Sequence, residues 1–312
     1  MVLKYFRQED TAQYESDVDI IICGCGCEDR SIYVAKQFVL TSIKSKLAFA
    51  FDQPKDDERW KTNYNYYREN GFRIVESDGY DLQIITENVI KEINRFVLQK
   101  EVLKVVIDIS SMTRLWYASI LSLFSNRDLP FSQIRCVFYY AENSETSIDN
   151  FSDLKIQPIR GYSNIAVPEK PTALVLGVGE INNILNYLIG YFNADRVICF
   201  YTGYSGKDSL DKMYSNTQFI PYSIDKMVGA FSELWDVCKS LSEDYRVVII
   251  PCGPKPFTLI SFLLRYFLHE IDVWKVGPLH DVRMEDNSPT GKVIQLEIKY
   301  ERPGMMDENK HT

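Results

Sequence analysis

The sequence has very few histidines, and this scarcity excludes several classes of enzyme. Among 312 residues only His269, His280 and His311 occur, all near the carboxyl end. No HExxH motif and no Ser–His–Asp or Cys–His arrangement is visible, so a zinc protease or a hydrolase with such a catalytic group is not expected. The GxGxxG fingerprint and the Gly-Lys-Ser/Thr ending of a P-loop are missing as well, which disfavours a nucleoside triphosphatase.

Long hydrophobic runs are also absent. The longest apolar stretches have about ten residues, whereas a helix that spans a bilayer needs about 20. The first residues, MVLKYFRQED, lack the apolar segment of a signal peptide. We therefore expect no membrane segment, and a cytoplasmic protein.

Positive charge is in deficit, with 35 Lys and Arg against 43 Asp and Glu and a formal net charge of −8. A surface that coats DNA or RNA needs a clustered positive field, so general DNA binding is not expected, whereas a local pocket for a small anion is compatible with this charge. The seven cysteines are odd in number and lie mostly in apolar runs, which favours reduced core residues. Cys23, Cys25 and Cys27 have no nearby histidine or fourth cysteine, so we expect no metal site.

What the sequence does contain is one pattern that occurs twice. Each half opens with a short apolar segment that ends in glycine, at 17–26 and at 172–179, as in a buried strand. Further strand-like and helix-like segments then alternate, which predicts parallel strands joined by helical crossovers. The expected fold class is therefore α/β: two tandem Rossmann-like lobes, each a mostly parallel sheet flanked by helices.

The two halves share an order of elements that can be given by residue range. The expected strands of the first half are 17–26, 46–52, 72–78, 103–110 and 134–142, and its helices are 31–44, 82–99 and 115–125. The second half gives strands 172–179, 196–202, 217–223, 245–253 and 271–277, and helices 181–193, 228–242 and 257–269. Residues 292–300 alternate well enough for an extra strand, which we expect to be antiparallel at an edge of a sheet. We expect a first lobe over 1–145, a linker over 146–170, a second lobe over 171–303 and a flexible tail over 304–312.

In open α/β sheets, ligands bind outside the carboxyl ends of the strands, where helix N-termini present backbone amides to anions. The loop after the first strand reads CGCGCEDRS and contains Gly26, Glu28 and Arg30. Gly26 permits close backbone approach to a ligand, and Arg30 is a candidate anion contact. The alternative is that Asp29 or Ser31 caps a helix and that Arg30 is a surface charge.

The turn after the fourth strand, DISSMTR, is the most specific feature of the sequence. It presents Asp108, Ser110, Ser111, Thr113 and Arg114 between a buried strand and a helix. Hydroxyls and amides there suit phosphate or ribose oxygens, and Arg114 suits a bidentate phosphate contact. The alternative is that Ser111 or Thr113 caps the helix and Asp108 anchors the loop. As catalytic candidates the sequence offers Asp108 and Glu28, without distinguishing a general base from a ribose-binding carboxylate.

The second half has the related turn PCGPKPFT. It places Lys255 and Thr258 at the start of a helix, and Gly179 and Glu180 follow the first strand of that half. A lysine at a helix N-terminus is unfavourable for the helix itself, which suggests an anionic ligand. A proline-rich turn with a solvated lysine is the alternative.

The glycine loop after the first strand, together with the Asp108–Arg114 turn, resembles the CRISPR-associated Rossmann-fold (CARF) sensor domains. Those domains carry an Asp-x-Thr-Gly-Gly-Thr-Lys-like turn after the fourth strand, and here Asp108, Ser110, Ser111, Thr113 and Arg114 are comparable. The doubled arrangement is similar to the related SAVED domains. In this chain Ser111 and Met112 replace the glycine pair, and the motif is confined to the first half.

The resemblance implies recognition of a cyclic or linear oligonucleotide messenger by the loops after strands one and four. Our leading expectation is a sensor of a nucleotide or oligonucleotide messenger in prokaryotic antiviral defence or stress signalling, with no cofactor and with a separate effector protein as partner. From this sequence we expect no attached nuclease, protease or membrane effector. Two alternatives stay open: an enzyme on a nucleotide-like substrate, such as a ring nuclease, phosphodiesterase or N-glycosidase, and a scaffold subunit of a larger complex. Formation of a homodimer is also left open.

Overall fold

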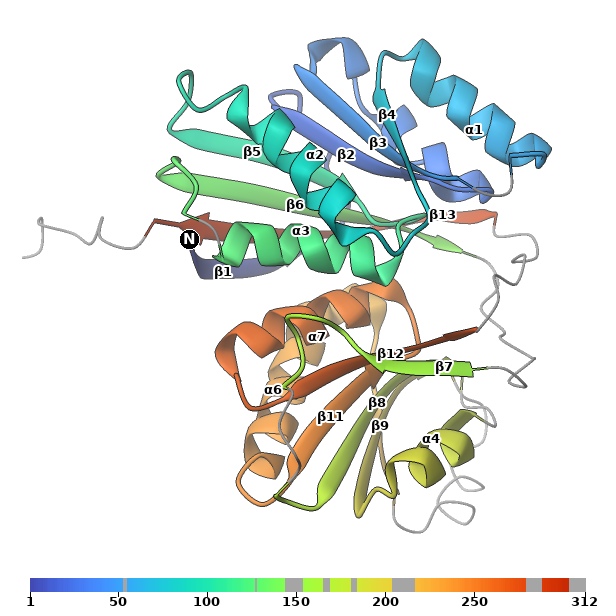
Figure 1. The fold of residues 1–312 in the computed structure, drawn as a ribbon, viewed down its shortest axis with the longest axis vertical. Coiled ribbons are helices and arrows are strands. Elements are labelled where there is room, and N and C mark those ends of the chain that lie inside the picture. The colour runs from blue at the N-terminus through green and yellow to red at the C-terminus, as the bar shows by residue number, and fades with distance from the viewer. Residues whose placement is uncertain are drawn as a thin grey trace, which may run out of the picture. The chain divides into compact units, whose positions relative to one another are not determined.

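The computed structural model describes residues 1–52, 55–126, 128–143, 154–164, 169–180, 184–203, 217–278 and 288–302. The chain divides into two compact units. Unit 1 comprises Met1–Ser144 together with Asp286–Thr312, and unit 2 comprises Glu145–Glu285. Each unit contains one mostly parallel sheet with helices on its faces, so the predicted α/β class with two Rossmann-like lobes is confirmed (Figure 1).

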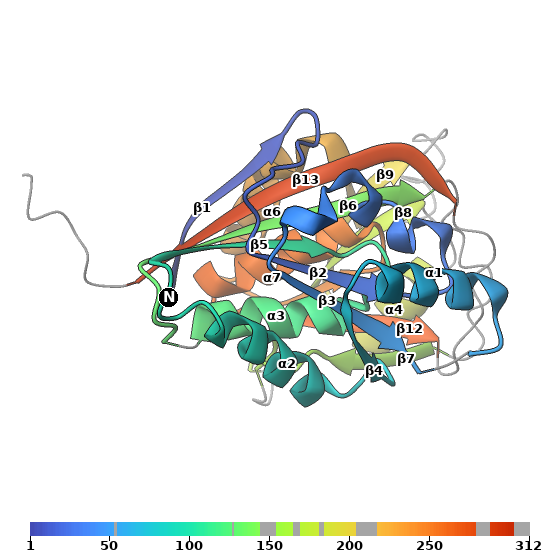
Figure 2. The same cartoon turned by 90° about the horizontal axis from the view of Figure 1, so that it is seen from above.

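The sheet of unit 1 has seven strands in the order β1-β13-β6-β5-β2-β3-β4 (Figure 2). Their bounds are β1 Val2–Glu9, β2 Ile20–Cys25, β3 Ser45–Phe51, β4 Arg73–Ser77, β5 Val102–Asp108, β6 Gln133–Asn143 and β13 Pro289–Glu301. The five strands from β2 to β6 run parallel, β13 pairs antiparallel with β6, and β1 pairs antiparallel with β13 at the edge. In chain order the parallel strands therefore lie 3-2-1-4-5, the Rossmann order.

Strand order determines which helices cover which face of this sheet. The connections from β2 through β3 to β4 step in one direction and include α1 (Glu58–Glu69), whereas α2 (Leu82–Asn94) and α3 (Arg114–Asn126) belong to the connections that lead to β5 and β6. Because such crossovers are right-handed, the reversal places the two groups on opposite faces. Accordingly α2 packs beside α3, and α1 packs with the short turns that follow β2.

The side chains of unit 1 explain why these elements form. Trp60 and Tyr67 of α1 pack in one cluster with Cys23 and Cys25 of β2, because alternate residues of a strand share a face. The helix α2 begins at Asp81, whose carboxylate accepts hydrogen bonds from the backbone N–H groups of Gln83 and Ile84. All seven cysteines are free, and five are buried, as expected for reduced core residues.

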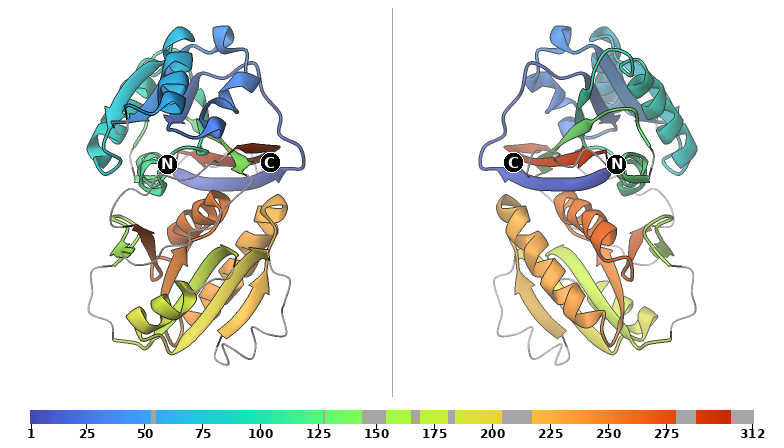
Figure 3. Two further views of the ribbon diagram at one scale, coloured as in Figure 1. Left: turned by 90° about the vertical axis from the view of Figure 1, so that its right-hand side faces the viewer. Right: turned by 90° about the vertical axis from the view of Figure 1, so that its left-hand side faces the viewer.

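Unit 2 repeats the topology with the strand order β10-β9-β8-β11-β12-β7. Its strands are β7 Leu154–Pro158, β8 Thr172–Glu180, β9 Arg196–Gly203, β10 Thr217–Pro221, β11 Arg246–Pro251 and β12 Asp272–Pro278. The strands β8 to β12 run parallel in the same 3-2-1-4-5 order, and β7 adds antiparallel to β12. Figure 3 shows α4 (Ile184–Phe192) on one face of this sheet, and α6 (Met227–Leu241) and α7 (Lys255–Phe267) on the other.

Four features differ from the sequence-based expectation, and the first is the strand β1, Val2–Glu9, which the sequence did not predict. The strand expected at 292–300 is β13, but it pairs with β6 of unit 1, whereas the sequence predicts these residues in the second lobe, 171–303. The expected linker over 146–170 contributes β7 to the sheet of unit 2. Instead of a helix over 31–44, the chain forms three short 3-10 turns, Asp29–Ile32, Ala35–Gln37 and Leu40–Ser42. An apolar pattern predicts burial, but it does not name the strand partner or guarantee a continuous helix.

The tail over 304–312 lies outside the described residues. Within the described part of the chain, no helix has the length and apolar character that a membrane span requires.

Candidate functional site

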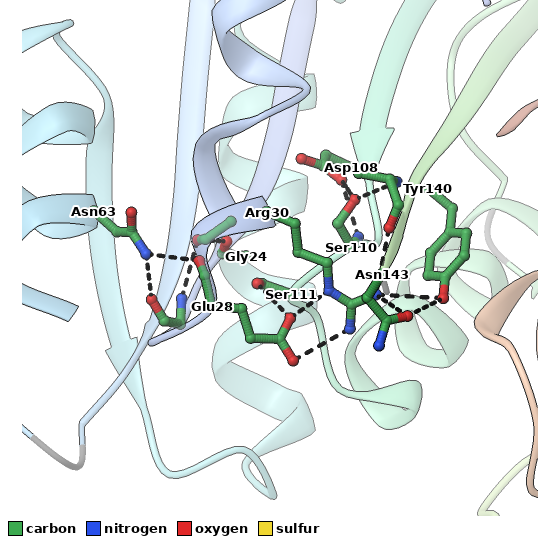
Figure 4. Close-up of polar contacts among 12 residues, drawn as sticks. Gly24, Glu28, Arg30, Asn63, Asp108, Ser110, Ser111, Tyr140 and Asn143 are labelled. Atoms are coloured by element: carbon green, nitrogen blue, oxygen red, sulfur yellow. Dashed lines mark hydrogen bonds and ion pairs between the residues drawn. The ribbon is translucent and has the colours of Figure 1, made fainter. Parts of the chain in front are cut away.

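The candidate site of unit 1 lies where the strand order reverses, between β2 and β5. The last residue pair in their parallel register is Cys23 with Asp108, so both strands deliver their following loops to the same edge of the sheet. This is the topological switch point at which open α/β sheets bind ligands. Glu28 and Arg30 come from the first loop, and the polar turn that starts at Asp108 forms the second (Figure 4). Gly26 is the residue that directly follows β2.

Hydrogen bonds from inside the unit fix the loop after β2. Ser31 Oγ donates to the carbonyl oxygen of Gly24 at 2.8 Å and accepts from the backbone N–H of Gly26 at 3.2 Å. Asn63 of α1 is buried, and its side-chain amide donates to the carbonyl oxygens of Gly26 at 2.8 Å and Glu28 at 2.9 Å. The loop is thus held from both the strand and the helix.

Glu28 and Arg30 form an ion pair at the centre of the site. Arg30 Nε lies 2.6 Å from one Glu28 carboxylate oxygen, and Arg30 Nη2 lies 3.2 Å from the other, as in a fork-to-fork contact. The Arg30 side chain is 5% exposed and that of Glu28 is 17% exposed. Burial by itself would lower the pKa of Arg30, but the Glu28 carboxylate outweighs it and raises the pKa above its ordinary value.

Arg30 also reaches the end of β6. Its Nη1 group donates to the carbonyl oxygen of Ala141 at 3.3 Å, to Asn143 Oδ1 at 3.2 Å and to the hydroxyl of Tyr140 at 3.3 Å. The guanidinium carbon lies 5.5 Å from the centre of the Tyr140 ring, within cation–π range. The predicted anion contact is therefore engaged with groups of the protein itself.

The turn after β5 is organised by Asp108 and two serines. Asp108 Oδ1 accepts from the backbone N–H of Ser110 at 2.9 Å and from its hydroxyl at 2.5 Å. Ser110 Oγ in turn accepts from the backbone N–H of Ala141 at 2.8 Å. Ser111 Oγ donates to the Glu28 carboxylate at 3.1 Å and so joins the two loops. Asp108, Ser110 and Ser111 are all buried.

Thr113 and Arg114 stand at the start of α3. The hydroxyl of Thr113 accepts from the backbone N–H of Trp116 at 3.1 Å, which is an N-terminal cap. Arg114 is the first residue of α3 and is half-buried. The capping interpretation therefore accounts for Thr113, and Arg114 follows it as the first residue of the helix.

Glycine is required where the two loops meet. A Cβ atom on Gly24 would lie 2.8 Å from the backbone nitrogen of Met112 and 2.8 Å from the carbonyl carbon of Ser111. Real Cβ atoms do not approach backbone so closely, so a side chain at Gly24 would push the Asp108–Arg114 turn away. The glycine-containing sequence after the first strand thus serves loop packing as well as ligand access.

In unit 2 the end of β8 and the turn after β11 approach each other as closely as the corresponding segments of unit 1. Here the glycine lies in the turn after β11, whereas in unit 1 it lies in the first parallel strand, β2. A Cβ atom on Gly253, in the turn after β11, would lie 2.6 Å from the carbonyl carbon of Val178 and 2.7 Å from the nitrogen of Gly179. Lys255 is the first residue of α7 and is half-buried, whereas Thr258 is fully buried in that helix. Thr258 therefore packs in the core. The side chain of Glu180 lies outside the described residues.

The structure brings together most of the residues predicted for the first lobe: Gly26, Glu28, Arg30, Asp108, Ser110 and Ser111. Sequence reasoning missed three of their partners, namely Asn63, Tyr140 and Asn143. Asn63 lies three residues after Trp60 in α1, a helix rich in aromatic residues, and Asn143 is the last residue of β6. Neither position carries a local sequence signal of its role. Among the described residues, no group of three or more potential metal ligands is present.

Comparison with known proteins gave no match to a protein family and no match to a curated protein.

Proposed function

We propose that unit 1 binds a nucleotide or an oligonucleotide messenger at the switch point between β2 and β5, and that the protein acts as a sensor in prokaryotic defence or stress signalling. The observation that carries this proposal is the convergence of a carboxylate, a serine hydroxyl and an arginine-led helix N-terminus at one edge of a Rossmann-ordered sheet. Those groups are Glu28, Ser111 and Arg114.

The two kinds of group suit the two ends of a nucleotide. A phosphate accepts hydrogen bonds and is favoured at a helix N-terminus, where Arg114 adds a positive charge. Ribose hydroxyls and the amino groups of bases donate hydrogen bonds, and Glu28 is the acceptor on the other side of the turn. A chain with a net charge of −8 relies on such local geometry rather than on a positive surface.

The first experiment is a thermal-shift screen of the purified protein against mono- and dinucleotides and against cyclic and linear oligonucleotides. A ligand at 100 times its dissociation constant adds about 2.7 kcal/mol of stability, which is a readily measured shift. Liquid chromatography with mass spectrometry on the same mixtures then shows whether the ligand is intact. An intact ligand supports a sensor, and a consumed ligand identifies an enzyme.

Calorimetric titration of a binder identifies the site. We expect Arg114→Ala to weaken binding at least tenfold, which corresponds to about 1.4 kcal/mol. Arg68→Ala, which removes an exposed arginine in the last turn of α1, is the matched control and should bind as the unchanged protein does. Equal affinity for both variants, or no thermal shift with any nucleotide, would contradict the proposal. The polar turns after β2 and β5 would then have a structural function only.

A further inference from the structure

The chain crosses between the two units twice, and both crossings meet unit 1 at one place. The chain leaves unit 1 after Ser144, directly beyond the end of β6, and returns at Asp286, shortly before β13 begins. Asn143 and Pro289 are partners in the register of these two strands. Thr290 Oγ1 also donates to a carboxylate oxygen of Glu142 at 3.3 Å, so a side-chain hydrogen bond joins the end of β6 to the start of β13.

One short segment of unit 1 contacts both ends. Arg30 donates to Asn143 Oδ1 at 3.2 Å, on the outgoing side. On the returning side, Ser288 Oγ donates to Asp29 Oδ2 at 3.2 Å, and the hydroxyl of Tyr33 donates to the carbonyl oxygen of Gly291 at 3.3 Å. We name residues 28–33 the clamp, because this segment fastens both roots of the connection to unit 2.

The clamp is equally joined to the switch point. Glu28 accepts from Ser111 in the turn after β5, and Ser31 donates to the carbonyl oxygen of Gly24 at the end of β2. A continuous polar network therefore runs from the turn after β5, through the Glu28–Arg30 pair, to Asn143 (Figure 4). The guanidinium of Arg30 is planar and rigid, so a shift of Glu28 that turns Arg30 also changes its contact with β6.

We propose that the clamp couples the state of the switch point to the restraint on unit 2. Arg30 holds the outgoing segment, and Asp29, which lies between Glu28 and Arg30 in the chain, holds the returning one. A rearrangement of the Glu28–Arg30 pair that moves this backbone therefore alters both attachments. A bound group that competes for Glu28 or Arg30 favours one arrangement of this pair over the other. It changes the restraint on unit 2 to the extent that its binding free energy differs between the two arrangements. The identification of that group as a nucleotide rests on the proposed function, but the coupling itself does not.

The coupling can be tested without any ligand, by electron–electron double resonance between two spin labels. Labels introduced through an unnatural amino acid at Lys91 of α2 and Lys239 of α6 report on one exposed site in each unit and avoid the native cysteines. We expect Arg30→Lys, which keeps the charge but loses the fork to Glu28 and Asn143, to broaden or shift the distance distribution. Arg246→Lys is the control, because Arg246 makes a comparable 2.8 Å ion pair with Asp272 within unit 2.

A second variant keeps the test decisive if Arg30→Lys fails to fold. Asp29 is exposed, so Asp29→Ala removes the acceptor of Ser288 at little cost to the core. We expect a change in the same direction and of smaller size. A folded clamp variant with a distribution equal to that of the unchanged protein would overturn the proposal. Because no nucleotide is added, this outcome is independent of whether unit 1 binds one.

Discussion

Arg30 and Asn143 are 113 residues apart in the sequence, and a 3.2 Å hydrogen bond joins them. This contact makes Arg30 a link between the loop after β2 and the end of β6. Its guanidinium is satisfied by a carboxylate, an amide oxygen, a carbonyl oxygen and a phenol, all from unit 1. An arginine in a glycine-containing loop thus stabilises the site from within.

Replacing Arg30 with alanine should destabilise unit 1 by about 3 to 5 kcal/mol, because breaking a buried ion pair leaves Glu28 and the end of β6 without their partner. Urea unfolding followed by circular dichroism measures the loss. Lys61→Ala is the control, since Lys61 pairs with Glu58 on the exposed surface of α1 and its removal should leave the midpoint unchanged. Equal midpoints for the two variants would contradict a structural function of Arg30.

Gly24→Ala should destabilise the protein by about 1 to 3 kcal/mol, since the new Cβ atom would collide with the backbone of Ser111 and Met112. Gly26→Ala is a close control, because its Cβ atom would meet Phe51 and Ser111 at an ordinary 3.6 Å. Thermal unfolding of both variants gives the comparison. A stable Gly24→Ala protein would show that the turn after β5 can move without cost.

Glu297 of β13 should give the protein a stability that depends on acid pH. Burial by itself would raise the pKa of Glu297, but hydrogen bonds from Arg135 and Arg7 outweigh it and bring the pKa below its ordinary 4.5. The carboxylate therefore contributes fully above pH 4.5, and this stability disappears as the pH falls through the lowered pKa.

Glu297→Gln should accordingly lower the free energy of unfolding at neutral pH by about 2 kcal/mol and should reduce the difference from the unchanged protein as the pH falls. Unfolding curves between pH 7 and pH 3 measure this convergence. Glu58→Gln changes a carboxylate that is 86% exposed and should show neither effect. Parallel pH profiles for Glu297→Gln and the unchanged protein would contradict the assignment.

Asn63→Ala should loosen the loop after β2, because it leaves the carbonyl oxygens of Gly26 and Glu28 without the amide that donates to them. We expect a loss of about 1 to 3 kcal/mol. Hydrogen exchange read by mass spectrometry should show faster exchange in peptides that cover residues 24–33. Asn88→Ala is a suitable comparison, since Asn88 donates to a helix carbonyl in α2, and it should leave that exchange unchanged.

The five parallel strands of each unit and their order of appearance were predictable, because a buried strand leaves a short apolar run that ends in polar or glycine residues. The strands β1 and β7 were not predicted. The pairing partner of β13 was not predictable from the sequence. The alternation along 292–300 indicates a strand with one apolar and one polar face, but it carries no information about β6. The Asp108–Arg114 turn was found because five polar residues follow a buried strand. The burial of the Arg30 side chain was not predictable, because it depends on contacts with Tyr140 and Asn143, which lie far along the chain.

The return of β13 to the first sheet makes unit 2 an insertion within unit 1, with a consequence for synthesis on the ribosome. Residues 145–285 are contiguous and can complete their own sheet as soon as they emerge. Unit 1 is the first to be synthesised but the last to complete its sheet. Among the described residues β1 pairs only with β13, and the outer edge of β6 stays unpaired until β13 has been synthesised. The usual order, in which the earlier part of a chain folds first, is therefore reversed.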